Sequence, residues 1–308
     1  MKIYLSNLNE SWVVDRFRAD WYKNNPQIST TNIISADIVW IISPWVWKKI
    51  SKKYLKTKKV ICSIYHIDFE NFDVKERSDF YKRDKYVDTY HVISQKTANE
   101  LKKLTEKTII SIPFWVDQKV FKNLQNKEEL RSLFGFKNND FLVGSFQRDS
   151  EGKNVNLPKL IKGPDIFVKI VDDLYKKNKN LKIVLSGKRR DYVKFELDKL
   201  GIPFSYFEMV DIDQINKLYN LLDLYIVSSR LEGGPQAIME CAISKTPVIS
   251  TNVGVATEIL NTTSIYENQD DYYKAIVDVE YAYKQALNHT LPNGMKKFIE
   301  MFTELYEN

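Results

Sequence analysis

The segment with the clearest chemical character runs from Ser228 to Leu260, with the sequence SSRLEGGPQAIMECAISKTPVISTNVGVATEIL. Glu232 and Glu240 stand in it with seven residues between them, and Gly-Gly-Pro follows the first glutamate directly. A glycine-rich loop that opens a helix presents free backbone N–H groups, which bind anions such as phosphate. Carboxylates accept hydrogen bonds from the paired hydroxyls of a ribose or a sugar. The segment therefore predicts a site for a ligand that carries both phosphate and hydroxyl groups.

The elements on either side of this loop place it at the edge of a sheet. The apolar run Leu224–Ser228 predicts a buried strand, the residues after Pro235 predict a helix, and Val248–Ser250 predicts another buried strand. In an open sheet of parallel strands, such strand-to-helix loops lie at the carboxyl edge, where ligands bind.

The same alternation of strand and helix runs along the whole chain and predicts parallel sheets of the α/β class. Ser94 and Pro164 are expected to open helices, and Gly201 to end one. The other expected strands are Lys2–Leu5, Ile38–Ser43, Val60–Tyr65, Tyr90–Ser94, Thr108–Ile112, Phe141–Phe146, Leu181–Ser186 and Tyr206–Val210.

The length of 308 residues allows two domains. A polar stretch and a short helix precede Asn138, so we expect domains at 1–137 and 138–290, with a last helix in 291–308 that crosses back to the first domain. All ten glycines lie between Gly135 and Gly294. Because close backbone approach to a ligand needs glycine, the second domain is expected to handle the phosphates.

The order Glu-Gly-Gly-Pro-Gln-Ala-Ile-Met-Glu, followed by Thr-Pro-Val-Ile and Asn-Val-Gly, resembles the donor-site signature of the retaining GT-B glycosyltransferases, family 4 in particular. The resemblance implies two Rossmann-like domains that face a cleft. It also implies a nucleotide diphosphate sugar as donor, with uridine or guanosine as the base, and a metal-independent reaction without a cofactor. The acceptor would be a glycan, a lipid-linked molecule or another hydroxyl compound.

Further segments are similar to the same family. Val143–Arg148 and then Lys162–Asp165 resemble the arginine and the lysine–glycine pair that grip the donor diphosphate, although Lys153 or Lys159 could replace Lys162. Leu185–Gly187 and Phe207–Val210 resemble segments near the nucleotide, and Val60–His66 a strand that ends in a histidine.

The resemblance implies specific roles. Glu232 would hold hydroxyls of the donor sugar and Glu240 those of the ribose. Arg148 and Lys162 would neutralise the diphosphate, and His66 would hydrogen-bond the sugar near its anomeric carbon. The acceptor would attack from the front face, so that the leaving phosphate takes its proton. The wider donor-binding set would be Gly233, Gly234, Pro235, Gln236, Ala237, Gly187, Met209 and Ser145.

The net charge and the absence of several known motifs limit the kinds of ligand that we expect. The chain lacks GxGxxG, GxxxxGK[ST], HExxH and zinc-type cysteine spacings, and we expect no metal. Asp211-Ile212-Asp213 has the form DxD, but we interpret Asp213 as a helix cap. The net charge of +6 favours anionic partners. No motif supports a nucleic-acid partner.

A basic aromatic stretch, SPWVWKKISKKYLKTKK at Ser43–Lys59, is expected to form one helix from Pro44. A docked helix with a solvated lysine face is the simpler interpretation, and attraction to an anionic membrane or a lipid-linked acceptor is the alternative. Cys62 and Cys241 form no CxxC pair, and neither a signal peptide nor a membrane span is evident. We therefore expect a cytoplasmic protein, with peripheral membrane contact in the second case.

Two other functions fit parts of the sequence. A non-catalytic GT-B-like module that binds nucleotide sugars would explain why the first half lacks a glycine loop. Another GT-B enzyme, such as a nucleotide-sugar epimerase, would need a distinct set of acid and base side chains, which the sequence does not display.

Overall fold

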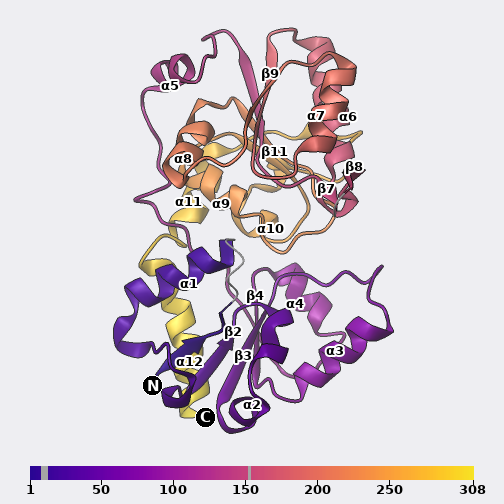
Figure 1. Ribbon diagram of the computed structural model, residues 1–308. Coiled ribbons are helices and arrows are strands. Elements are labelled where there is room, and N and C mark those ends of the chain that lie inside the picture. Colours follow the sequence, from indigo (N-terminus) through magenta and orange to yellow (C-terminus); the bar gives the residue numbers. More distant parts are fainter. Residues whose placement is uncertain (8–12, 152–153) are drawn as a thin grey trace. The chain divides into compact units, whose positions relative to one another are not determined.

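The computed structural model describes residues 1–7, 13–151 and 154–308, whose contacts divide them into two compact units (Figure 1). Unit 1 comprises Met1–Trp115 and Leu291–Asn308, and unit 2 comprises Val116–Thr290. Each unit has its own sheet and its own apolar core. The sequence suggested a boundary at 137/138 instead. Residues 116–137 pack within unit 2, where Leu130 and Phe136 share a core with Leu218.

Unit 1 contains a five-stranded sheet in the order β1-β2-β3-β4-β5, in which all neighbouring strands are parallel. Its strands are β1 (Ile3–Leu5), β2 (Ile38–Ile41), β3 (Lys59–Ile64), β4 (Thr89–Val92) and β5 (Thr108–Ser111). Its α-helices are α1 (Val13–Asn24), α2 (Lys52–Thr57), α3 (Val74–Asp84), α4 (Gln95–Leu101) and α12 (Lys296–Glu307), and the 3₁₀ helix η3 (Pro44–Lys49) precedes α2.

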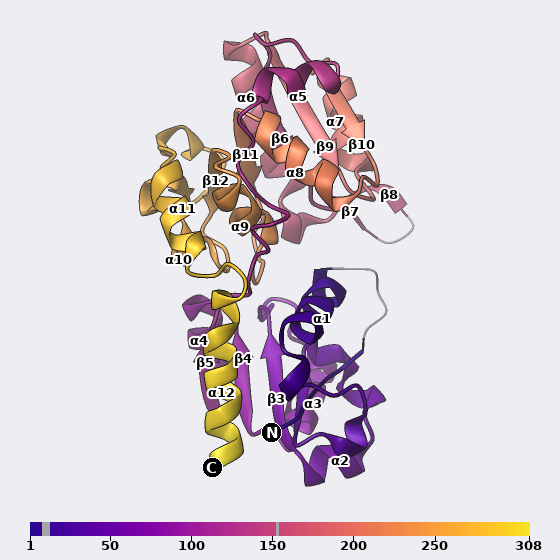
Figure 2. The same ribbon diagram turned by 90° about the vertical axis from the view of Figure 1, so that its left-hand side faces the viewer.

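The last helix, α12, packs into unit 1 although it is far from the other elements in sequence. Figures 1 and 2 show it in yellow beside the indigo and purple elements of that unit. Its Phe302 is fully buried, with ring centroids 5.2 Å from both Trp21 of α1 and Trp40 of β2. Buried aromatic pairs of this kind contribute packing area and favourable ring contacts, so α12 is an integral part of this core.

Unit 2 contains a six-stranded parallel sheet in the order β10-β9-β6-β11-β12-β13. Its strands are β6 (Phe141–Ser145), β9 (Leu181–Ser186), β10 (Phe204–Phe207), β11 (Leu224–Val227), β12 (Val248–Thr251) and β13 (Ile265–Tyr266), with a separate hairpin of β7 (Ser150–Glu151) and β8 (Asn154–Pro158). Its α-helices are α5 (Lys127–Leu133), α6 (Pro164–Lys177), α7 (Asp191–Leu200), α8 (Ile212–Leu221), α9 (Gln236–Ile243), α10 (Ala256–Ile259) and α11 (Val279–Leu287).

The strand order of unit 2 reverses at β6. From β6 the chain moves outward to β9 and β10, and then returns to the other side of β6 to form β11. Loops that leave β6 and β11 therefore diverge to opposite faces of the sheet. In open α/β sheets this switch point at the carboxyl ends of the strands is where ligands bind.

Several local predictions are confirmed. Ser94 caps α4 by accepting a hydrogen bond from the Thr97 N–H, Pro164 is the first residue of α6, and Gly201 ends α7 with a left-handed φ of 65°. Others need correction. The expected strand Tyr206–Val210 lies earlier, at Phe204–Phe207, and the β7–β8 hairpin was not expected.

The basic stretch Ser43–Lys59 does not form one helix. It forms η3 and α2, with a break at Ile50–Ser51, where the Ser51 side chain caps α2 by accepting from the Lys53 N–H. The Asp211-Ile212-Asp213 segment also differs in detail, because Asp211 rather than Asp213 caps α8, accepting from the Gln214 N–H at 2.8 Å. The structural role expected for this DxD sequence is retained.

Candidate functional site

The loops after β6, β9 and β11 carry most of the residues singled out in the sequence, and all of these belong to unit 2. The strands end at Ser145, Ser186 and Val227, and because they are parallel their carboxyl ends share one edge of the sheet. Ser229 Oγ lies 3.2 Å from Gln147 Oε1, a contact that joins the loops of β6 and β11 at the switch point.

Lys162 and Glu232 form an ion pair at this edge. Lys162 Nζ contacts Glu232 Oε1, and Ser229 Oγ donates to Glu232 Oε2 at 2.7 Å. The two charged side chains are only 21% and 16% exposed. Partial burial strengthens their attraction relative to a surface pair, and each charge supplies the compensation that the other needs.

The backbone at Gly163 fixes where Lys162 stands. Gly163 has a φ of 58°, and a Cβ added there would lie 1.8 Å from the carbonyl oxygen of Ser228. Only glycine permits this contact between the loop before α6 and the end of β11. The Lys162 carbonyl in turn accepts from Gln147 Nε2 at 2.8 Å. Lys162 is therefore tied to both strands that flank the switch point.

The two competing lysines differ in their placement. Lys159 Nζ lies 3.1 Å from Glu151 Oε1 of the β7–β8 hairpin, and Lys153 falls outside the described residues. Of the lysines whose positions the structure gives in this insertion, Lys162 is the one that contacts Glu232.

Arg148 lies on the loop after β6, one residue beyond Gln147. Its side chain is partly buried, and its Nε donates to the Ser150 carbonyl at 2.9 Å. Gln147 donates a hydrogen bond to the Lys162 carbonyl. The segment between Arg148 and Lys162 therefore starts and ends at the same edge of the sheet. This geometry accommodates the long spacing between Arg148 and Lys162.

Glu240 is buried in α9, with 7% of its surface exposed. Its Oε2 accepts from the Tyr219 hydroxyl at 2.9 Å. Burial, followed by the nearby charge of Glu240, holds the pKa of Tyr219 well above its ordinary value, so this tyrosine remains a donor. A carboxylate that is buried to this extent has to be held by donors, and Tyr219 fixes one of its oxygens.

The Gly233-Gly234-Pro235 loop leads into α9, and the segment after β12 packs against this loop. Gly254 has a φ of 45°, and a Cβ there would lie 1.8 Å from the Gly233 carbonyl oxygen. Thr251 Oγ1 also donates to the Ser229 carbonyl at 2.6 Å. Gly233 and Pro235 are buried, whereas Gly234, Gln236 and Ala237 are partly exposed.

A buried arginine was missed in the sequence. Arg190 is 1% exposed, and its Nε lies 2.7 Å from Asp149 Oδ2. Its Nη1 donates to the carbonyls of Ser145 and Ser186 at 2.6 and 3.2 Å, so one guanidinium ties together the ends of β6 and β9. Burial raises the pKa of the Asp149 carboxyl, although Arg190 lowers it.

The only signal for this arginine in the sequence is the basic run Lys188-Arg189-Arg190 directly after Gly187. In the structure Lys188 and Arg189 are exposed and Arg190 points inward. The Ser145 hydroxyl, which the sequence assigned to the donor, accepts from Arg190 Nη2 at 3.2 Å.

The remaining predicted residues occupy different surroundings. Gly187 has a φ of 90°, and its N–H donates to the Glu208 carbonyl at 2.9 Å, which joins the ends of β9 and β10. Met209 follows in the turn after β10 and is 64% exposed, so it is not a core residue. His66 belongs to unit 1, where it is exposed just after β3.

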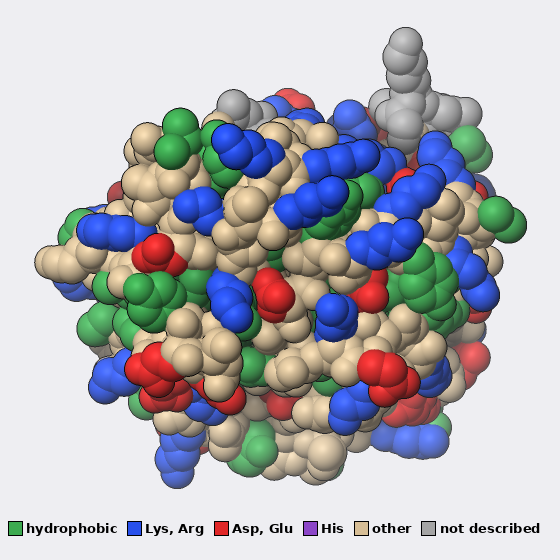
Figure 3. All heavy atoms as spheres, turned by 90° about the horizontal axis from the view of Figure 1, so that it is seen from below, with side chains coloured by type: hydrophobic (Ala, Val, Ile, Leu, Met, Phe, Trp, Pro, Cys, Tyr) green, Lys and Arg blue, Asp and Glu red, His purple; other side chains and the backbone are tan. Residues whose placement is uncertain are grey.

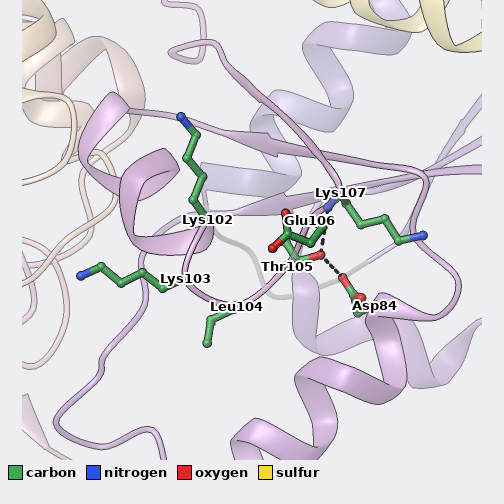
Figure 4. A pocket seen from close by; sticks show the side chains of 7 residues that line it. All are labelled: Asp84, Lys102, Lys103, Leu104, Thr105, Glu106 and Lys107. Carbon is green, nitrogen blue, oxygen red and sulfur yellow. Dashed lines mark hydrogen bonds between the residues drawn. The ribbon is translucent and has the colours of Figure 1, made fainter.

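A pocket lies in unit 1 away from these residues, lined by Asp84 and Lys102–Lys107 (Figure 4). Asp84 Oδ1 accepts from the hydroxyls of Thr105 and Tyr90 at 2.8 and 3.1 Å. Lys102, Lys103 and Lys107 point in different directions, so they do not converge on one anion (Figure 4). These residues precede β4 and β5 and thus lie at the amino edge of the sheet, opposite the edge where α/β sheets bind ligands.

Comparisons with known proteins agree with this architecture. The family model of the glycosyl transferases group 1 matches residues 127–280. No curated protein sequence matches the chain. A crystal structure of Anabaena HepE in complex with UDP and glucose superposes with a TM-score of 0.75 at 15% identity, covering 99% of this chain and 100% of that chain.

Two further structures share the fold at low identity. Sucrose-phosphate synthase from Thermosynechococcus elongatus gives a TM-score of 0.72 at 12% identity and covers 96% of this chain and 77% of its own. The pneumococcal O-GlcNAc transferase GtfA, in complex with UDP and GlcNAc, gives 0.62 at 14%, with 96% and 60% covered.

The two parallel sheets and these superpositions define a GT-B fold. With the matching family model, the chain belongs to the glycosyl transferases group 1, the family 4 glycosyltransferases. It is therefore a glycosyltransferase of a family whose members are retaining hexosyltransferases.

Proposed function

We propose that unit 2 binds a uridine diphosphate sugar at the carboxyl edge of its sheet and that the chain transfers the hexose, with retention, to a hydroxyl of an acceptor. The observation that carries this proposal is the Lys162–Glu232 pair at the switch point between β6 and β11. A nucleotide sugar has a partner for each charge of this pair, namely its diphosphate for the lysine and its sugar hydroxyls for the glutamate. Uridine is favoured over guanosine because HepE and GtfA were both solved with UDP.

The donor diphosphate is assigned to Lys162 and Arg148. When a ligand phosphate replaces Glu232 as the partner of Lys162, the carboxylate becomes available to the sugar hydroxyls. The backbone N–H groups at the start of α9, at Gln236 and Ala237, add further donors for the anion. Two fixed cations stabilise the charge that develops on the leaving diphosphate, which is what departure without a metal requires.

Glu240 is assigned to the ribose. Tyr219 occupies one oxygen of its carboxylate, and a buried carboxylate accepts several hydrogen bonds, so the ribose hydroxyls are suitable further donors. Met209 and Glu208, in the turn after β10, are assigned to the base side of the nucleotide beside Gly187.

In the reaction, the bond between the anomeric carbon and the diphosphate oxygen breaks, and a bond from the acceptor oxygen forms on the same face of the sugar. The acceptor proton passes to the departing phosphate oxygen, so no protein base is required. Unit 1, which contains His66, is assigned to the acceptor side, and hydrogen bonding of His66 to the donor sugar stays a prediction.

A donor screen tests the proposal. UDP- and GDP-linked hexoses are incubated with the protein in EDTA, and melting temperature and donor hydrolysis are measured for wild type, Glu232→Gln and the exposed control Glu267→Gln. We expect UDP-sugars to stabilise wild type and the control, with slow hydrolysis that Glu232→Gln loses. No response to any nucleotide sugar, or an equal loss in the control, contradicts the proposal.

A further inference from the structure

We propose that Arg189, in the loop between β9 and α7, binds the diphosphate of the nucleotide sugar together with Arg148. The inference rests on the proposed function of unit 2 and adds one donor-binding residue to it. Its starting point is the backbone of Arg189, which has a φ of 59° although arginine carries a Cβ. This left-handed conformation is unfavourable for such residues, and glycine is the usual occupant.

A second non-glycine residue with a positive φ, Lys245 at 54°, has an ordinary explanation. Lys245 follows the end of α9, where a left-handed residue commonly terminates a helix, and its Nζ lies 2.8 Å from Glu280 Oε1. Arg189 differs on both counts. A helix begins after it, and among the described residues its guanidinium forms no ion pair or hydrogen bond. The side chain of Arg189 is exposed and thus open to a ligand.

The surrounding loops hold the strained backbone of Arg189 in place. Its carbonyl accepts from the Asp149 N–H at 3.1 Å, and the N–H of Gly187, two residues earlier, donates to the Glu208 carbonyl at 2.9 Å. The buried guanidinium of Arg190, with Nε 2.7 Å from Asp149 Oδ2, anchors the other side of the same turn. Backbone strain that is fixed from several sides is often found at binding sites. The fold therefore keeps at this position a residue whose side chain it does not itself use.

The hydrogen bond to Asp149 also places Arg189 beside Arg148. Because Asp149 directly follows Arg148, standard bond lengths limit the distance between the Cα atoms of the two arginines to about 8 Å. Arg148 donates to the Ser150 carbonyl through Nε, and its terminal nitrogens form no other hydrogen bond within the described residues. From these positions both arginine side chains are long enough to reach one diphosphate.

Charge selects the diphosphate as the partner of Arg189. Two guanidinium groups from adjacent loops repel each other, and a phosphate bound by both would replace this repulsion by attraction. The planar fork of arginine also matches phosphate oxygens with two parallel hydrogen bonds. The carboxylate of Asp149 is buried and already paired with Arg190, so Arg189 needs its anionic partner from a ligand.

Exposure and charge alone would not single out Arg189. On the face shown in Figure 3, Lys and Arg side chains lie at many separate positions, with Asp and Glu between them. For the lysines of α2, contact with an anionic membrane stays a prediction from the sequence. No helix in the described parts of the chain is long and apolar enough to cross a membrane. Arg189 is distinguished by its backbone conformation, its anchored loop and its neighbour Arg148.

Substitution by glycine separates the role of the side chain from that of the backbone. Arg189→Gly removes the guanidinium, keeps the carbonyl that binds Asp149 and relieves the left-handed strain. Arg189→Asn is a second variant, because asparagine also tolerates this conformation. Lys188→Ala is the matched control, since Lys188 is an exposed cation in the same loop. Isothermal titration calorimetry gives the affinities for UDP and for saturating uridine, and thermal unfolding gives the melting temperatures.

We expect Arg189→Gly and Arg189→Asn to bind UDP about ten- to a hundredfold more weakly than wild type, as for the loss of a hydrogen bond between charged groups. Their affinity for uridine should stay the same, because uridine carries no phosphate. The melting temperature of Arg189→Gly should not fall, since the strain is relieved. Lys188→Ala should bind UDP as wild type does.

Several results would overturn the inference. Unchanged UDP affinity in both Arg189 variants would show that the guanidinium does not touch the donor, and an equal loss in Lys188→Ala would show a general effect of charge. An equal loss of uridine affinity would indicate a contact with the base or the ribose, and a lower melting temperature in both variants would indicate a structural role. In all these cases wild type still binds UDP, so the proposed function stands. Absence of UDP binding by wild type overturns the proposed function and this inference with it.

Discussion

The ammonium of Lys162 and the carboxylate of Glu232 form an ion pair, although they belong to loops that lead into two different helices, α6 and α9. Gly163 packs against Ser228 and brings the two loops together. The carboxylate is also held by Ser229, so the pair is part of a network and not an isolated contact. When a nucleotide sugar binds, its diphosphate would become the partner of Lys162, and its sugar hydroxyls would become the partners of Glu232.

Removing the charge of Lys162 should impair turnover specifically. We expect Lys162→Met to lower kcat/KM for the nucleotide sugar by roughly a hundred- to a thousandfold, because a preorganised cation stabilises the leaving diphosphate. Lys159→Met is the matched control, since Lys159 lies in the same insertion but pairs with Glu151. Steady-state donor turnover checks this, and a similar loss in both variants would refute the assignment to Lys162.

Gly163→Ala should destabilise unit 2 by considerably more than Gly201→Ala. Both glycines have a left-handed φ, at 58° and 65°. A Cβ at Gly201 meets nothing within 4 Å, whereas one at Gly163 would lie 1.8 Å from the Ser228 carbonyl oxygen. Gly201→Ala should cost about 1 kcal/mol in the free energy of unfolding, from the backbone conformation alone, and Gly163→Ala several times as much.

Urea unfolding of the two glycine variants gives this comparison. Equal midpoints for Gly163→Ala and Gly201→Ala would mean that the close approach of Gly163 to β11 is not present in solution. Loss of UDP binding in Gly163→Ala at temperatures where it remains folded would show that the approach also positions Lys162.

Arg190 should be required for the stability of unit 2. Arg190→Met leaves Asp149 buried without its partner, which typically costs about 3–5 kcal/mol. The double variant Arg190→Met/Asp149→Asn removes that unpaired charge and should recover part of the loss. Chemical denaturation of the three proteins checks this, and a single variant as stable as wild type would contradict the bridging role of the guanidinium.

His91 should make unit 1 less stable at acid pH. It is fully buried, with Nδ1 2.8 Å from Ser63 Oγ and Nε2 2.8 Å from the Ile112 carbonyl. Burial lowers its pKa to about 4. Because the unfolded chain then binds the proton more readily, stability is present above the unfolded pKa of about 6.5 and is lost as pH falls towards 4.

The expected slope is about 1.4 kcal/mol for each pH unit between these two values. The free energy of unfolding at pH 7 and pH 5 is compared for wild type and His91→Gln. The pH-dependent difference between them should be roughly 2 kcal/mol. An identical pH dependence in both proteins would show that His91 does not titrate in this way.

The sequence predicted the edge of the second sheet better than the interior behind it. Glycine and proline favour particular local backbone conformations, and the two glutamates have a fixed spacing. The loop at Glu232 and the helix with Glu240 could therefore be located from the order of these residues alone. The position of Arg190 could not be predicted. Its guanidinium donates to carbonyls at the ends of β6 and β9, and these two strand ends lie together only in the folded sheet.

Elements with weak local signals were placed less well. The helix expected from Pro44 breaks at Ile50–Ser51, where the serine side chain offers the backbone a new cap. Residues 116–137 looked like the end of the first half, because nothing in their polar composition shows that Leu130 and Phe136 pack with α8. Such tertiary contacts between distant segments are not encoded in local periodicity.

The most direct test of the donor site compares UDP with 2′-deoxy-UDP on wild type and Glu240→Gln by isothermal titration calorimetry. If Glu240 holds the ribose, wild type should bind UDP about ten- to a hundredfold more tightly than the deoxy analogue, as expected for a hydrogen bond to a charged group. Glu240→Gln should lose most of that preference. Equal preference for UDP in both proteins, or no binding of UDP by wild type, would contradict the account.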